Sequence, residues 1–379
     1  MNPNRDCPVC NTKPNKNDII YHIPFSDGTL QEISCCPECG MVFASMTPSI
    51  EYSKESIYAA SGATGSGDSL LDKEKFCGTV EILESEFPNK EISILDVGCA
   101  QGGLLSELER HSYENAMGMD LSQSCVDACR AKNLMAFNGS LDNPPTGKYD
   151  LIILSHVLEH VWNVPATLKW IQSSLKPIGK VYIEVPNAME YENYLVCPFQ
   201  DFNREHINHF SATHFIMVLN YNGFQKEASG LRELSIPGGK YPAMWSIFSL
   251  GDNPWTTKIS NNLLKDSIQR YIEKSKELMH IIDLKLRPKL EGRNIAIWGY
   301  GEFSQQLFLT DAVQSAKIIQ VIDKDPSKQG KLFHGISVES PDKLQQDIPV
   351  LVTSMLNSSA ICRDIQKLNR DNPIILVEK

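Results

Sequence analysis

The sequence lacks a long apolar run, an excess of positive charge and the apolar core of a signal peptide. No stretch reaches the roughly 18 apolar residues that a membrane-spanning helix needs, so we expect no membrane segment. The net charge of −10 argues against a nucleic-acid partner, because nucleic-acid-binding surfaces are basic. The opening residues 1–6 carry no secretion-type apolar segment, and we expect a cytoplasmic protein.

What is present is an ordinary globular composition. The 379 residues are 42% hydrophobic and 22% charged, which suits a chain with a buried core. This length allows two or three domains. Eleven cysteines without a secretion signal indicate thiols and metal ligands rather than disulfides.

Four of these cysteines form two CPxC pairs near the N-terminus: Cys7 with Cys10, and Cys36 with Cys39. Two such turns present four thiolates, the ligand set of a closed tetrahedral zinc site. Gly40 permits a tight turn after the last cysteine. The pattern predicts a structural Zn²⁺ ribbon over residues 1–48, with a redox dithiol as the alternative and Cys35 as a competing thiol.

A strand, a glycine turn and a helix follow one another from Ile92 to Leu108. The apolar, β-branched run predicts a buried parallel strand. The glycines let the backbone turn sharply and let a ligand approach where a Cβ would stand. The helix N-terminus offers free N–H groups to a polar ligand, so the stretch predicts a cradle for a nucleotide-type cofactor.

The spacing Asp96-x-Gly98-x-Ala100-x-Gly102 resembles the first motif of the class I S-adenosylmethionine (SAM) methyltransferases. Ala100 stands where that family usually has its second glycine. A dinucleotide-binding GxGxxG is one alternative, which Gly98-x-Ala100-x-x-Gly103 fits loosely. The other alternative is an ordinary strand–turn–helix, in which the glycines only allow the turn and bind no ligand.

Further strands and helices alternate after the cradle, which predicts a doubly wound α/β parallel sheet over residues 91–235. The second strand ends at Asp120, whose carboxylate can accept both ribose hydroxyls of SAM or, alternatively, cap the next helix, as Ser122 also can. The resemblance adds further cofactor contacts: Leu121 beside that acid, Ser140 and Leu141 near the adenine, and Ser155 and His156 near the methionine part. His160, at the end of a VLEH segment of the same superfamily type, is expected to pack or cap.

The span 199–211 concentrates acids, an arginine and histidines after the fifth predicted strand, where substrate-facing loops belong. Adjacent Glu205 and His206 suit proton abstraction, because imidazole titrates near neutral pH and a nearby carboxylate raises its pKa and orients it. His209 is a further candidate. The alternative is that these polar groups only hold the loop through hydrogen bonds.

The order of a four-cysteine ribbon, a SAM domain, an EHINHFS segment and a second Rossmann-like domain resembles the sugar C-methyltransferases of deoxysugar pathways. In that family a base of the Glu-His pair removes the proton beside a keto group of a nucleotide-linked sugar, and the enolate attacks the SAM methyl group. The resemblance implies Glu205 and His206 as this pair and Tyr58 as a pocket tyrosine. Asn203 stands where the sugar enzymes often have a tyrosine. O- or N-methylation of another small molecule, and a non-catalytic zinc-ribbon interaction protein with a degenerate SAM fold, therefore remain alternatives.

The remaining chain connects and extends these parts. Residues 49–90 are expected to hold a Gly/Ser loop, either a lid or a plain linker, and a helix over 70–87. Residues 236–290 are expected to be a Gly/Pro-rich connection, which begins near Leu231, and a long helix ended by Pro288. Residues 291–379 repeat the strand–glycine turn–helix design in a Rossmann-like domain, with Ser304 where a third glycine belongs. The resemblance implies that this domain helps to hold the substrate's nucleotide; scaffolding is the alternative.

Overall fold

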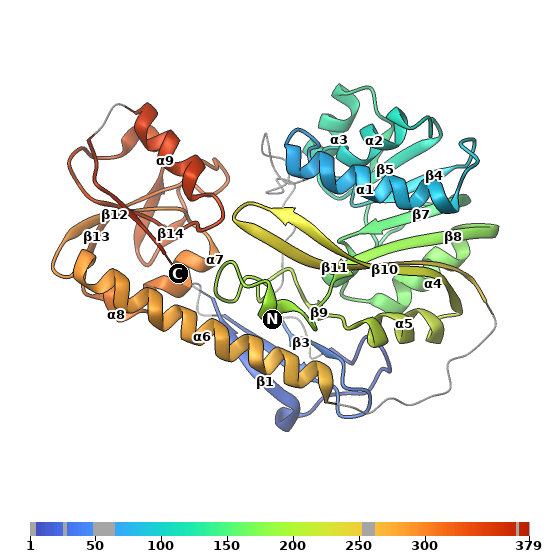
Figure 1. Ribbon diagram of the computed structural model, residues 1–379, viewed down its shortest axis with the longest axis horizontal. Helices are drawn as coiled ribbons and strands as arrows, with labels where there is room; N and C mark the ends of the chain where they lie inside the picture. Colours follow the sequence, from blue (N-terminus) through green and yellow to red (C-terminus); the bar gives the residue numbers. More distant parts are fainter. Residues whose placement is uncertain (1–4, 26–28, 48–64, 252–261, 369–370, 379) are drawn as a thin grey trace.

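The computed structural model describes residues 5–25, 29–47, 65–251, 262–368 and 371–378. The chain forms three β-sheets and one long helix, α6 (Leu263–Leu290), which runs diagonally across the lower left of the view in Figure 1. None of the described helices combines the length and the apolar character that crossing a bilayer requires.

The N-terminal sheet contains the strands of the predicted ribbon and one strand from much later in the chain. Strands β1 (Ile19–Pro24), β2 (Leu30–Cys35) and β3 (Val42–Met46) are antiparallel neighbours, preceded by the short 3-10 helix η1 (Lys16–Asp18). The two-residue strand β9 (Asn208–His209) pairs with β3, with Val42 opposite His209. The ribbon therefore holds the segment in which the sequence predicts the catalytic residues.

The central sheet has seven strands in the order β10-β11-β8-β7-β4-β5-β6. The five strands from β8 to β6 are parallel: β8 (Leu175–Pro186), β7 (Tyr149–Ser155), β4 (Ile94–Val97), β5 (Ala116–Asp120) and β6 (Ala136–Asn138). The chain runs from β4 outward to β6 and then returns to β7 on the other side of β4. The border between β4 and β7 is thus the topological switch point, where α/β sheets bind ligands.

Helices cover both faces of this sheet, as the alternating pattern predicts (Figure 1). They are α1 (Leu70–Glu86), α2 (Gly103–Arg110), α3 (Gln123–Ala131), α4 (Val164–Ser174) and α5 (Ala212–Tyr221), with the 3-10 turns η3 (Leu158–His160) and η4 (Tyr191–Asn193). In β7 the side chains alternate between two buried clusters, because successive residues of a strand point to opposite faces. Ile152 and Leu154 join one cluster, and Leu151 and Ile153 join the other. The predicted doubly wound sheet is confirmed.

The expected Gly/Pro-rich connection after Leu231 is wrong. Strands β10 (Phe224–Ile236) and β11 (Gly239–Leu250) form a long hairpin, and β11 lies antiparallel between β10 and β8. The glycines mark only the turn, where Gly238 has φ +82°, and Pro242 precedes the stretch that pairs with β8. A domain boundary after 235 would divide this hairpin, so we propose that the central domain continues to Leu250; the other boundaries stay predictions.

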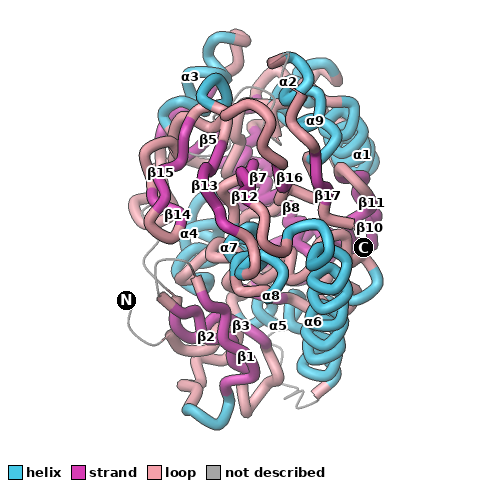
Figure 2. Tube along the Cα trace, turned by 90° about the vertical axis from the view of Figure 1, so that its left-hand side faces the viewer, coloured by secondary structure: helices cyan, strands magenta, loops and turns pink. Residues whose placement is uncertain are grey.

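The C-terminal sheet has the order β14-β15-β13-β12-β16-β17, and Figure 2 shows it above the ribbon strands with α6 beside both. Its strands are β12 (Asn294–Trp298), β13 (Lys317–Ile322), β14 (Leu332–Phe333), β15 (Ile336–Glu339), β16 (Val350–Val352) and β17 (Ile374–Leu376). Its helices are α7 (Glu302–Phe308), α8 (Asp311–Gln314), α9 (Ser358–Lys367) and the 3-10 turn η5 (Pro341–Lys343). Apart from β14, these strands are parallel, which agrees with the predicted Rossmann-like domain.

Helix α6 joins the cores of the two larger parts. Ile268 and Tyr271, in its first half, belong to the cluster under the central sheet, whereas Leu286 and Leu290 belong to the C-terminal core. The prediction that Pro288 ends this helix is wrong, because the helix continues to Leu290. A proline so close to the end removes only one backbone hydrogen bond, and packing of Leu290 outweighs that loss.

Candidate active site and zinc site

The glycine turn after β4 adopts the left-handed backbone that its sequence predicts. Gly98, Ala100 and Gly102 have φ of +74°, +47° and +79°. A side chain in this region costs on the order of 1 kcal/mol, which explains why glycine occupies two of the three positions. Ala100 is held there by its N–H, which donates to Asp120 Oδ2 over 2.9 Å.

Asp120 ties the glycine turn to the end of β5. Its second oxygen, Oδ1, accepts from the N–H of Ser122 over 2.8 Å, and Ser122 itself caps α3. The expected alternative, in which Asp120 is the helix cap, is therefore wrong. Burial raises the pKa of Asp120, and its two backbone hydrogen bonds oppose that rise. Each carboxylate oxygen can accept a second hydrogen bond, and Leu121 beside it is 44% exposed.

The other predicted cofactor residues lie around the same strand ends. Asp96 is inside β4 and only 3% exposed, and burial raises its pKa well above the usual value. Ser155 ends β7 and donates to Glu184 Oε1 over 3.4 Å. Ser140 and Leu141 follow β6, at the outer edge of the group; Ser140 Oγ accepts from the N–H of Asn143.

The described end of the Gly/Ser loop packs on the cradle. Gly103, the first residue of α2, donates its N–H to the carbonyl oxygen of Gly65 over 3.1 Å. Lys132 donates to the carbonyl oxygens of Ser66 and Gln101 over 2.6 and 3.0 Å. The described end of this loop therefore lies against the cradle, and the choice between a lid and a plain linker stays a prediction.

A buried ionic cluster lies beside the cradle, at the ends of β7 and β8. His156, with φ +57°, lies between two carboxylates: its Nδ1 is 3.3 Å from Glu159 Oε1 and its Nε2 is 3.1 Å from Glu184 Oε1. Arg232 Nη1, from β10, is 2.6 Å from Glu184 Oε2. His156 thus contacts protein carboxylates on both nitrogens, on the side where the sequence predicts the methionine part of SAM.

Mutual contacts set the charges in this cluster. Burial and Lys75 would lower the pKa of His156, but the contacts with Glu159 and Glu184 outweigh them and raise it. Burial would raise the pKa of Glu159, but the charged contact with His156 outweighs it and lowers that pKa to about 2. The pKa of Glu184 is also lowered, because His156 and Arg232 outweigh its burial. The sequence analysis did not predict roles for Glu159, Glu184 and Arg232. The available signal was Glu184, an acidic residue within the mostly apolar strand β8.

His206 lies near this cluster, but its environment differs from the predicted one. Burial, together with the charge of His160, lowers its pKa to about 3, whereas the prediction is a raised pKa. The carboxylate among the main influences on this pKa, which it raises, is that of Glu159. The loop is shaped by Asn203, whose Oδ1 accepts from the N–H groups of Glu205 and His206 over 2.9 and 2.8 Å.

The other two histidines of this region pack against aromatic rings, and only the ring of His160 also makes a hydrogen bond. The ring of His160 meets that of His206 edge-on at 5.0 Å, and its Nδ1 is 2.9 Å from the carbonyl oxygen of Glu205. His209 is fully buried against the rings of Tyr191 and Phe202, and neither nitrogen has a hydrogen-bond partner, which favours packing over catalysis. Tyr58 lies outside the described residues.

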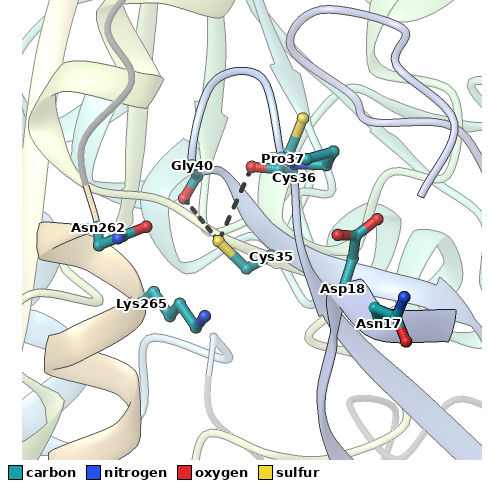
Figure 3. A pocket seen from close by; sticks show the side chains of 8 residues that line it. All are labelled: Asn17, Asp18, Cys35, Cys36, Pro37, Gly40, Asn262 and Lys265. Atoms are coloured by element: carbon teal, nitrogen blue, oxygen red, sulfur yellow. Dashed lines mark hydrogen bonds between the residues drawn. The ribbon is translucent and has the colours of Figure 1, made fainter. Parts of the chain in front are cut away.

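The four predicted metal ligands converge in the ribbon. Sγ of Cys7 is 3.6 Å from that of Cys39, and Sγ of Cys10 is 3.5 and 3.6 Å from those of Cys36 and Cys39. Four sulfurs at ~2.3 Å from a tetrahedral zinc ion are about 3.8 Å apart, so these residues fit Zn²⁺. Cys35 does not compete: its Sγ contacts the carbonyl oxygens of Cys36 and Gly40 and lines a separate small pocket beside Lys265 (Figure 3).

Comparison with known proteins gives a match within the central domain. A model of the methyltransferase domain family matches residues 73–229. This match agrees with the predicted methyltransferase domain, and the sheet confirms the predicted doubly wound α/β fold.

The relatives cover parts of the chain. Ubiquinone biosynthesis O-methyltransferase of Pelagibacter ubique is 29% identical over 122 residues, which are 30% of this chain and 50% of that protein. The mitochondrial enzyme of the same name from Saccharomyces cerevisiae is 35% identical over 108 residues, which are 26% of this chain and 34% of that protein. The chain thus spans half or less of these two relatives.

Solved structures that resemble this chain include a protein from Pyrococcus horikoshii, with a TM-score of 0.40, 17% identity and coverage of 48% of this chain and 93% of that one. Magnesium protoporphyrin IX methyltransferase from Synechocystis, with bound SAH, has a TM-score of 0.38, 17% identity and coverage of 47% and 84%.

Proposed function

We propose that the protein is a SAM-dependent methyltransferase that acts on a small molecule. The observation that carries this proposal is the left-handed glycine turn, tied by Ala100 N–H to Asp120, at the switch point of a sheet within the matched methyltransferase domain. The curated function of the relatives, O-methylation in ubiquinone biosynthesis, supports the same class of reaction.

The residues present fit SAM by their chemistry. Asp120 would accept from the ribose hydroxyls, and the exposed Leu121 would contact the adenosine part; we assign Gly98, Gly102 and Ser155 to the same cofactor. When bound, SAM supplies a methyl group on a sulfonium that is an excellent leaving group. The described segment 65–67, packed on the glycine turn, would exclude water from the donor.

The more specific proposal is C-methylation of a nucleotide-linked keto-sugar. His206 would be the base that accepts the proton beside the keto group, and Glu159 stands near it as the carboxylate that the sequence assigned to Glu205. The chain then has to align carbon and methyl group and accept one proton. We also propose Tyr58 as a residue of this pocket and Zn²⁺ as the structural ion of the ribbon.

One contact supports a nucleotide-linked substrate. Glu302, the first residue of α7, accepts from the N–H of Arg204 in the loop that carries His206. The glycine turn of the C-terminal domain therefore lies beside that loop, near α7 in Figure 1. We propose that this turn contributes to holding the substrate's nucleotide.

O-methylation is the second candidate, and the names of the relatives favour it. It needs proton removal from oxygen only, so exchange of a carbon-bound proton separates the two reactions. A non-catalytic zinc-ribbon protein is the third reading, and it requires that SAM does not bind.

The test uses two variants and two measurements. We expect Asp120→Ala to weaken SAM binding at least tenfold in calorimetry, because the ribose loses its charged acceptor. We expect His206→Ala to keep SAM affinity within about twofold and to lose at least a hundredfold in methyl transfer to a panel of nucleotide-sugars with labelled SAM. Deuterium from solvent should enter the substrate of the unaltered protein in the absence of SAM.

Glu190→Gln serves as the control and should alter neither measurement, because this half-buried carboxylate accepts from Asn193 and belongs to neither proposed site. Failure of the unaltered protein to bind SAM would overturn the proposal. Methyl transfer without deuterium exchange would replace C-methylation with O- or N-methylation.

A further inference from the structure

Three metal-ligating side chains meet next to the proposed cofactor site and away from the cysteines. One donor atom from each of Glu159, His160 and His206 lies within 4.8 Å of the other two. Among the described residues, only this group and the four cysteines bring three such donors together. Donors around one ion at about 2.0–2.2 Å are roughly 3.4 Å apart, so small side-chain rotations close the site.

Buried polar atoms on two of these three residues lack the hydrogen bonds that such groups normally make. Both carboxylate oxygens of Glu159 and the Nδ1 of His206 are buried without a hydrogen-bond partner. Glu159 is only 1% exposed, and its nearest charged neighbour is His156, at 3.3 Å. His156 offsets part of the cost of burying this carboxylate, and a cation on its open lone pairs would offset more of it.

The surroundings of His160 are those of a metal ligand. Its Nδ1 is 2.9 Å from the carbonyl oxygen of Glu205 and can only donate to it, since a carbonyl accepts. This contact fixes the proton on Nδ1 and leaves the lone pair on Nε2, which lies 3.9 Å from Glu159 Oε1. Histidines that ligate metals typically donate their other nitrogen to a backbone carbonyl in this way.

We propose that Glu159, His160 and His206 form a second metal site, which binds a divalent first-row transition metal ion. Two imidazoles and one carboxylate suit Zn²⁺, Mn²⁺ or Fe²⁺ better than Mg²⁺ or Ca²⁺, which favour oxygen ligands. Three protein ligands leave coordination positions open, as in catalytic sites and unlike the closed four-cysteine site.

The role of this ion rests on the proposed function. An oxygen of the acceptor molecule would occupy an open position, and the ion would polarise it as a Lewis acid and fix its place relative to the donor. In the metal-loaded protein His206 is then a ligand and not the base, so this inference replaces the role that the sequence assigns to that residue. The metal content of the protein distinguishes His206 as a ligand from His206 as a base, because a base does not require a bound ion.

The experiment is a titration of the metal-free full-length protein with Co²⁺. Thiolate-bound Co²⁺ gives intense charge-transfer bands, whereas a nitrogen and oxygen site gives weak visible bands only. We expect two Co²⁺ per chain, and one in each of Glu159→Gln and His206→Gln, with the thiolate bands intact. Those bands also show that the ribbon of each variant is folded.

His111→Gln is the matched control, because His111 is a partly buried histidine beside two carboxylates, those of Glu84 and Glu107, but belongs to no three-donor cluster among the described residues. It should keep two ions. One Co²⁺ per chain with thiolate bands alone, or a second ion that survives in both variants, would overturn the proposal. SAM calorimetry on the same samples separates the two proposals: SAM binding with one ion leaves the proposed function standing, and two ions without SAM binding leave only the metal site.

Discussion

Glu184 is paired through its carboxylate with two positive groups, the guanidinium of Arg232 and the imidazole of His156. It is 0% exposed, and its carboxylate contacts Arg232, His156 and the hydroxyl of Tyr182. Removal of one partner from a buried ion pair leaves the other charge uncompensated and costs about 3–5 kcal/mol. We therefore expect Glu184→Gln to lower the free energy of unfolding by about this amount, measured by urea denaturation.

The matched control is Glu233→Gln, which removes an exposed carboxylate paired with Lys240. Exposed pairs contribute little because water and salt screen them, so this variant should unfold like the unaltered protein. Equal effects of the two substitutions would contradict the assigned role of Glu184.

Individual residues were predictable where a backbone rule or a motif selects the residue type. The glycines of the turn, Asp120 and the four cysteines follow such rules, and their geometry agrees with the predictions. The surroundings of His206 did not follow, because adjacency in sequence favours Glu205 as its partner, whereas the fold brings Glu159 close from another strand end. The charge state of a buried group depends on such distant neighbours.

At the level of elements, the same design occurs twice in this chain. Gly98 N–H donates to the carbonyl oxygen of Met119, and Gly299 N–H donates to that of Ile322, over 2.7 and 2.8 Å. In the C-terminal domain Asp323 accepts from Tyr300 N–H over 2.7 Å, as Asp120 does from Ala100. Both turns were predicted because local sequence determines them.

The two turns differ in what covers them, and this difference can be tested. A Cβ at Gly103 would lie 2.4 Å from Phe76 Cε2 and 2.7 Å from Gly67 N, whereas a Cβ at Gly301 would meet no atom within 4 Å. Overpacking of this kind costs about 1–3 kcal/mol. We expect Gly103→Ala to lower the free energy of unfolding by this amount and to weaken SAM binding, and Gly301→Ala to do neither. Unchanged unfolding and SAM affinity in Gly103→Ala would show that the segment 65–67 does not cover the cradle.

The hairpin β10–β11 was missed for a different reason. Apart from Gly230, its glycines and prolines occur at the turn and just before the stretch that pairs with β8. The strand signal follows them, in the mostly apolar residues 243–250, of which most are buried. The glycines and prolines of this region were interpreted as one irregular connection, although the chain here forms two paired strands. Helix α6 was predicted more easily because a 3.6-residue period persists over many turns, although its proline did not end it.

Across the whole molecule, both flanking parts contact the loop that carries His206. From the ribbon, Ala44 N–H donates to the carbonyl oxygen of Ile207 over 2.9 Å, and the side chain of Arg5 donates to Asn208 Oδ1. From the C-terminal domain, Glu302 accepts from Arg204 N–H. A two-residue strand such as β9 has no sequence period of its own, so only the assembled fold reveals that the ribbon supports this loop.

The contact of Glu302 predicts how stability changes with pH. Burial raises the pKa of Glu302 to about 7, the Arg204 N–H opposes the rise and the Glu205 carboxylate adds to it. The folded state therefore binds more protons than the unfolded state between the ordinary value of 4.5 and about 7. The contribution of Glu302 to stability is fully present below pH ~4.5 and is lost as pH rises to ~7. We expect Glu302→Gln, which cannot ionise, to lose less stability than the unaltered protein between pH 5 and 7.5 in urea denaturation.

Burial also raises the pKa of Asp201 to about 7, so Asp201 contributes equally in both proteins to the change of unfolding free energy with pH. Identical slopes for the two proteins would mean that Glu302 ionises freely and that the C-terminal domain does not bury it against the loop.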